Sequence, residues 1–181
     1  MLYNVAQLLK APVGADLRAP IEGALKLNGD EATIVAPITG DVRFQRTNQG
    51  ILATGDFETT VQMQCVRCID TFEQPIHIDF SELYMPTVEV LTGHPLPHVN
   101  EEEAFPIDAH HHLDLAEMIR QQIVLALPMQ PLCREDCAGL CPVCGKNRNV
   151  DPCDCVQQED VRWNALAGLK LEDIVNEESE N

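Results

Sequence analysis

In the N-terminal half of the chain, hydrophobic and polar residues alternate with the period of two that marks a half-buried β-strand. The alternating runs occupy residues 21–27, 32–36, 42–45, 57–65 and 76–84. Turn-forming residues separate them at 28–30 and 48–50. Because only every second residue is apolar, the pattern predicts an antiparallel meander with one face in water.

Other segments repeat with the helical period instead. Asn4 is placed to cap a short helix that ends at Pro12, and Asp114 is placed to cap a longer one that stops at Pro128. The longer segment carries a broad apolar face, formed by Leu115, Ile119, Ile123 and Leu127. We expect this helix to pack across the sheet, and a final helix to begin at Asp160.

Together these elements predict an α+β fold, in which an antiparallel sheet is packed by a central helix and followed by cysteine-rich, zinc-binding loops. Within one compact domain overall, we expect an N-terminal helix and sheet region (1–84), an acidic and proline-rich linker (85–112), a helix with a zinc-binding module (113–171) and an acidic tail (172–181). Three consecutive histidines, at 110–112, end the linker. Adjacent side chains splay apart, so this triplet favours a solvated loop over a metal site.

Cysteines provide the chemistry of the chain. Six of the eight lie between Cys133 and Cys155, and the other two, Cys65 and Cys68, form a C-x2-C pair at the end of a predicted strand. Within the cluster, the sequence Cys-Pro-Val-Cys-Gly-Lys at 141–146 is typical of a metal-binding knuckle. Its glycine permits a positive φ, which directs the following N–H groups toward a thiolate.

Eight thiols divide into two sets of four, which is the all-sulfur ligand set of tetrahedral Zn²⁺. We assign the first site to Cys65, Cys68, Cys133 and Cys137, and the second to Cys141, Cys144, Cys153 and Cys155. The prediction is therefore two zinc ions per chain. Disulfides would need an oxidising compartment, and the N-terminus shows no basic secretory leader. An iron–sulfur cluster uses the same thiolates, and the spacing alone does not separate iron from zinc.

The formal net charge of −17 disfavours broad contact with the phosphates of a nucleic acid and favours a basic protein partner. Four basic residues nevertheless lie beside cysteines and form a candidate binding patch, namely Arg67, Arg134, Lys146 and Arg148. The alternative is that they only offset thiolate charge. No apolar run is long enough to span a membrane, so we expect a cytoplasmic protein.

The order of these features resembles the YceD (DUF177) family, the large ribosomal RNA subunit accumulation proteins. The resemblance rests on the N-terminal Asn-Val-Ala-Gln-Leu-Leu-Lys helix, the Cys-Val-Arg-Cys turn at 65–68, the helix Leu-Asp-Leu-Ala-Glu-Met-Ile-Arg and the cysteine segment from Pro131 to Asn147. It implies a bacterial cytoplasmic factor for synthesis, processing or stability of 23S ribosomal RNA. Its partners would be a ribosomal protein or an rRNA-processing factor of the large subunit, with local rRNA contact.

Two alternatives belong to other functional classes. A catalytic zinc needs an open coordination position and a nearby acid or base, whereas all-cysteine sites are usually closed and no H-E-x-x-H motif is present. A zinc-ribbon regulator that reads nucleic acid is opposed by the charge of the chain. We therefore expect a non-enzymatic factor without a small-molecule substrate.

Overall fold

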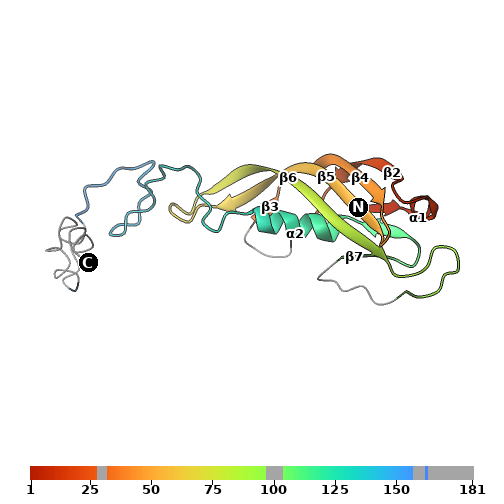
Figure 1. Ribbon diagram of the computed structural model, residues 1–181. Helices are drawn as coiled ribbons and strands as arrows, with labels where there is room; N and C mark the ends of the chain where they lie inside the picture. Colours follow the sequence, from red (N-terminus) through yellow and green to blue (C-terminus); the bar gives the residue numbers. More distant parts are fainter. Residues whose placement is uncertain (28–31, 97–103, 157–161, 163–181) are drawn as a thin grey trace, which may run out of the picture. The chain divides into compact units, whose positions relative to one another are not determined.

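The computed structural model describes residues 1–27, 32–96, 104–156 and 162 (Figure 1). Its contacts divide the chain into two units, Met1–Cys137 and Ala138–Asn181, and each is described by itself below. The expected turn at 28–30, the expected helix from Asp160 and the expected acidic tail lie outside the described residues. The domain boundaries given above stay a prediction.

A mixed β-sheet forms the body of the first unit (Figure 1). Its strands are β2 (Asp16–Gly23), β3 (Ala32–Ile34), β4 (Ile38–Arg46), β5 (Ile51–Gln64), β6 (Thr71–Pro86) and β7 (Phe105–Ile107). They lie in the order β2-β4-β5-β6-β7, and β3 pairs with β5 beyond the end of β4. All of these pairs are antiparallel except β6 with β7, which is parallel.

Strand β5 shows why the sheet forms where the alternation predicted it. Phe57, Thr59, Val61 and Met63 are all buried, while the residues between them are exposed or half-buried. The β5–β6 hairpin is the longest pairing, running from Ile51 opposite Tyr84 to Gln64 opposite Thr71. Its far end is therefore the turn that carries Cys65 and Cys68.

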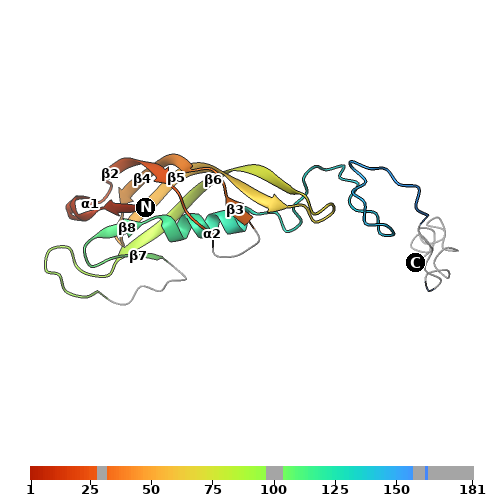
Figure 2. The same cartoon turned by 180° about the vertical axis from the view of Figure 1, so that it is seen from behind.

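Helix α2 (Ala116–Ala126) covers the buried face of the sheet, as seen from both sides in Figures 1 and 2. Met118, Ile119 and Ile123 are fully buried against the sheet residues. A shorter helix, α1 (Ala6–Lys10), buries Leu8 and Leu9 in the same core. The predicted α+β class, with a helix packed on the sheet, is confirmed.

Capping of α2 is simpler than the sequence predicted. The N-cap position is Leu115, which makes no side-chain cap hydrogen bond, and Asp114 just before it accepts a hydrogen bond from the Ala116 N–H at 2.9 Å. Glu117, in the first turn of the helix, accepts hydrogen bonds from the side chains of Arg120 and Gln121. Neither helix is long and apolar enough to cross a membrane within the described part of the chain.

Two residues of the histidine triplet, His110 and His111, lie in a turn between β7 and β8, and His112 begins β8 (His112–Asp114). Strand β8 pairs with β1 (Leu2–Asn4). The Asp108 carboxylate organises this turn, because it accepts hydrogen bonds from the backbone N–H groups of His110 at 2.8 Å and His112 at 2.7 Å. Burial raises the pKa of Asp108, but these N–H bonds and the His112 ring lower it below its ordinary value.

Candidate metal centres

The first thiol cluster lies at the tip of the β5–β6 hairpin, where the chain segment that follows α2 returns to it. Its four sulfurs, from Cys65, Cys68, Cys133 and Cys137, lie within 4.8 Å of one another. The Sγ atoms of Cys65 and Cys137 are 3.8 Å apart, and those of Cys68 and Cys133 are 3.7 Å apart. Three of the four cysteines are buried, so the cluster is largely closed to water.

The hairpin turn is shaped as a knuckle around this cluster. The Ile69 N–H donates to the Cys65 carbonyl, and the Cys65 N–H donates to the Asp70 carbonyl, both at 2.9 Å. Ile69 has a φ of 65°, which is rare for a β-branched residue. This strained residue keeps the backbone turned so that neighbouring N–H groups point at sulfur.

Three hydrogen bonds hold the returning segment against the knuckle. The Val66 N–H donates to the Pro131 carbonyl at 3.0 Å. The Arg67 guanidinium donates through Nη1 to the carbonyls of Cys137 at 3.1 Å and Glu135 at 3.4 Å. Phe72 and Leu132 pack as apolar cover against the buried cysteines. Arg67, which the sequence suggested as part of a binding patch, thus also positions a thiol-bearing loop.

The second cluster lies wholly within the second unit. The sulfurs of Cys141, Cys144, Cys153 and Cys155 again lie within 4.8 Å of one another. Its knuckle repeats the first, because Gly145 N–H donates to the Cys141 carbonyl and Cys141 N–H donates to the Lys146 carbonyl, both at 2.8 Å. Gly145 has the positive φ of 74° that the sequence predicted. Here Cys144 and Cys155 are exposed, so this cluster is more open than the first.

Backbone N–H groups favour a thiolate in each knuckle. Burial raises the pKa of Cys65, but the N–H groups of Cys133, Cys68 and Arg67 outweigh it and lower that pKa to about 6. In the second cluster, the N–H groups of Cys144 and Val143 lower the pKa of Cys141 to about 6. A lowered pKa gives more thiolate at these two cysteines, and thiolate is the form that binds a metal. The neighbouring thiols and burial raise the pKa of Cys155 to about 12; at Cys68 the Asp70 N–H lowers the pKa, but burial and the neighbouring thiols raise it to about 12.

The donor set and its spacing fit a tetrahedral metal ion such as zinc. Four sulfurs at the Zn–S distance of about 2.3 Å around a tetrahedral ion lie about 3.8 Å from each other, close to the separations in the first cluster. No disulfide joins any of the eight cysteines, all of which the structure describes. The structure therefore brings together the same two sets of four that the spacing suggested, and each set could hold a metal ion.

The four basic residues of the candidate patch are divided between the two units. Arg67 and Arg134 belong to the first, where Arg134 Nε lies 3.4 Å from the Asp136 carboxylate. Lys146 and Arg148 belong to the second, and the Arg148 N–H donates to the Gly139 carbonyl. The patch stays a prediction.

Comparison with known proteins bears on the whole cysteine-containing region. The family model described as large ribosomal RNA subunit accumulation protein YceD matches residues 53–170, which include all but the first two residues of β5, the whole of α2 and all eight cysteines. The chain belongs to the YceD family. The family's description connects it with accumulation of large-subunit ribosomal RNA.

Relatives of this YceD family chain occur in mycobacteria. Uncharacterized proteins of Mycobacterium bovis and Mycobacterium tuberculosis are each 27% identical over 159 residues, covering 88% of this chain and 69% of theirs. An uncharacterized protein of Mycobacterium leprae is 27% identical over 142 residues, covering 77% of this chain and 62% of its own. No solved structure matches the chain.

Proposed function

We propose that this YceD family protein is a non-enzymatic, zinc-stabilised factor that supports synthesis, processing or stability of 23S ribosomal RNA during assembly of the large subunit. The observation that carries the proposal is the pair of four-thiol clusters inside the region matched by the family model. Four thiolates occupy all four coordination positions of a tetrahedral ion and leave none open for a substrate, which is the arrangement of a structural site.

In this proposal the first cluster links two distant parts of the chain. Zinc bound to the first, through Cys65, Cys68, Cys133 and Cys137, would add coordinate bonds between the hairpin tip and the segment after α2. In small domains that do not fold without zinc, metal binding contributes on the order of 10 kcal/mol of folding free energy. Here the link would be added to a sheet that already has its own hydrophobic core, so we expect a smaller contribution. The chain's own contacts from Val66 and Arg67 already orient that segment, so the ligands are held ready.

The proposed partner is a ribosomal protein or an rRNA-processing factor of the large subunit. The charge of −17 supports a basic protein partner and opposes broad contact with RNA. Local rRNA contact would be confined to Arg67, Arg134, Lys146 and Arg148. The proposal involves no membrane and no small-molecule substrate, and it places the protein in the cytoplasm.

Depletion and complementation in the host bacterium test the proposal. Loss of the protein should lower the ratio of 23S to 16S ribosomal RNA, and the wild-type chain should restore it. Replacement of Cys65 and Cys68 together by serine should fail to restore it. Val66→Ala is the matched control, because it changes an exposed residue of the same turn and keeps every ligand. An unchanged 23S level in depleted cells would falsify the proposed function.

A further inference from the structure

Strand β6 has a long unpaired edge. On one side it pairs with β5 from Thr71 to Tyr84, whereas on the other side it pairs with β7 only from Tyr84 to Pro86. Among the described residues, no strand pairs with this second edge between positions 71 and 83. Such an edge offers a row of backbone donors and acceptors to an added strand.

Two hydrogen bonds establish which residues face that edge. The Thr60 carbonyl of β5 accepts a hydrogen bond from the Val35 N–H, so the backbone groups of Thr60 point away from β6. Pro75 lies opposite Thr60 in the antiparallel pair, and its backbone carbonyl therefore points away from β5, toward the open edge. Just beyond the end of β6, the Thr87 N–H donates a hydrogen bond to the Ile107 carbonyl of β7, which lies on the side of β6 opposite β5. The odd-numbered residues of β6 therefore direct their backbone groups outward, which places those of His77, Asp79 and Ser81 on the open edge.

Pro75 marks one end of this edge. It has no N–H to offer, and its carbonyl accepts from the Gln74 side chain at 3.3 Å. The edge that can accept a strand therefore begins just beyond it. Lysine commonly protects such edges from unwanted pairing, but no lysine or arginine occurs between Arg67 and Arg120.

The residues that face the edge also lie on the solvent face of the sheet, where the charge is negative. His77 and Asp79 have side chains that are 58% and 88% exposed. Asp79 lies directly opposite Asp56, which lies directly opposite Asp41, so three aspartates cross three neighbouring strands in one row. Like charges placed opposite each other destabilise a sheet. A cationic partner would offset that repulsion.

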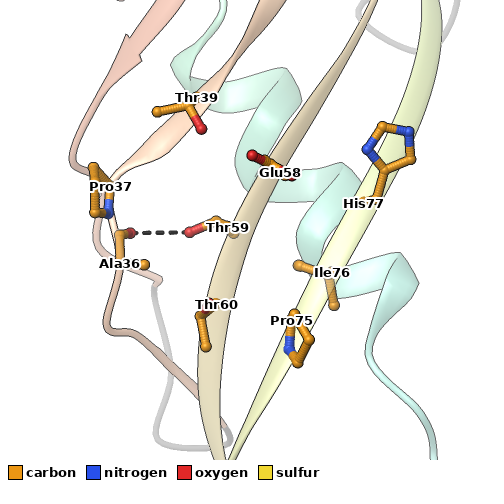
Figure 3. Close-up of a pocket in the computed structure, with 9 residues that line it drawn as sticks. All are labelled: Ala36, Pro37, Thr39, Glu58, Thr59, Thr60, Pro75, Ile76 and His77. Atoms are coloured by element: carbon orange, nitrogen blue, oxygen red, sulfur yellow. Dashed lines mark hydrogen bonds between the residues drawn. The ribbon is translucent and has the colours of Figure 1, made fainter.

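The adjacent row shows how the solvent face is shaped. Figure 3 shows Glu58 between Thr39 and His77, beside a shallow hollow of about 460 Å³ that reaches Pro37 and Pro75. A long, positively charged side chain from a strand beside β6 could lie across this face and reach Glu58. The hollow and the aspartate row thus extend the acidic surface inward from the open edge.

We propose that the open edge of β6, from His77 to Ser81, binds an extended lysine- and arginine-rich segment of a protein partner by strand addition. A second copy of this chain fits less well, because it would set Asp79 and its acidic neighbours beside their own like charges. The inference deepens the proposed function, on which it rests for the identity of the partner as an assembly-related protein.

A synthetic peptide tests the edge without reference to ribosomes. The probe is a blocked, fluorescently labelled peptide of about ten alternating lysine and valine residues, long enough for the edge at about 3.4 Å per residue. Binding to the full-length zinc-loaded chain is measured by anisotropy at low salt. A peptide with glutamate in place of lysine is the charge control.

His77→Pro is the decisive variant, because it removes an outward N–H and leaves the ladder to β5 intact. Pro75 shows that the strand accepts proline at an outward position. Loss of one edge hydrogen bond together with the steric block should weaken peptide binding by about tenfold or more. His77→Ala, which keeps the N–H, is the matched control and should bind within about twofold of wild type. Equal thermal melting of both variants establishes that they fold.

Amide hydrogen exchange supplies a second readout. Peptide binding should protect the N–H groups of His77, Asp79 and Ser81, with no new protection in the second unit. Equal peptide affinity for His77→Pro and wild type, or protection confined to other elements, would overturn the proposal. So would dimerisation of the free chain that His77→Pro abolishes, because the edge would then be a self-interface. If the peptide binds but the 23S level in depleted cells is unchanged, the strand-addition site is supported and the proposed ribosomal function is refuted.

Discussion

Replacing Cys65 and Cys68 together with serine removes both ligands that the β5–β6 hairpin supplies to the first cluster. The proposed metal link then no longer joins the hairpin tip to the segment after α2. The matched control replaces Cys141 and Cys144, the corresponding knuckle pair of the second cluster. Each double variant should retain one zinc ion per chain if the two sites are independent.

The size of the effect follows from the loop that the link closes. A cross-link between Cys68 and Cys133 encloses about 65 residues, for which the chain-entropy relation gives about 4 kcal/mol of stability. For a unit of this size, each kcal/mol shifts the melting temperature by about 3–5 °C. The Cys65 and Cys68 double variant should therefore melt about 10–20 °C lower in the first unit.

Far-UV circular dichroism followed in the β-sheet signal is the assay, with zinc measured on the same samples. The Cys141 and Cys144 double variant should leave this transition within about 2 °C of wild type, because its knuckle lies in the other unit. Equal shifts for the two double variants, or no shift for the first, would refute the reasoning that the first site cross-links the sheet to the segment after α2.

Three further predictions concern separate features. A chelator such as 4-(2-pyridylazo)resorcinol should take zinc from the exposed second cluster faster than from the buried first one. The two knuckle double variants described above show which kinetic phase belongs to which cluster. Faster release from the first cluster would contradict the burial argument. Ile69→Gly should relieve the left-handed strain of about 1–2 kcal/mol, offset by about 0.5–1 kcal/mol of glycine entropy, so urea unfolding should show an unchanged or slightly raised stability. Asp108→Ala should cost about 1 kcal/mol near neutral pH by freeing the N–H groups of His110 and His112. Because the pKa of Asp108 is lower in the folded state, its contribution to stability is complete above about pH 4 and is lost as the pH falls through the folded-state pKa. A stability difference between Asp108→Ala and wild type that stays constant into acid would contradict this.

The period of two in β5 was readable from sequence because its side chains alternate between core and solvent from Asp56 onward, with Phe57 and Val61 buried and their neighbours exposed or half-buried. The two thiol sets were readable for a different reason. An eight-residue loop easily returns Cys153 to the knuckle at Cys141, which leaves the distant pair at Cys65 and Cys68 for the remaining thiols. Both inferences depend on local geometry.

What the sequence missed depends on contacts distant along the chain. The parallel pairing of β7 joins a three-residue, proline-containing strand to β6, and nothing local marks it. The clamp from Arg67 to the Cys137 carbonyl depends on where the returning segment lies. The positive φ of Ile69 was hidden because isoleucine gives no turn signal, whereas Gly145 at the corresponding place in the other knuckle does.

The most direct test of two four-thiolate zinc centres is the metal content of the full-length protein together with the spectrum of its cobalt-substituted form. The account predicts about two zinc ions per chain, and the intense thiolate charge-transfer bands of tetrahedral cobalt for both sites. One band set should disappear in each knuckle double variant. A metal-free native protein, in which all eight thiols react at once with a thiol reagent while the sheet stays folded, would contradict it.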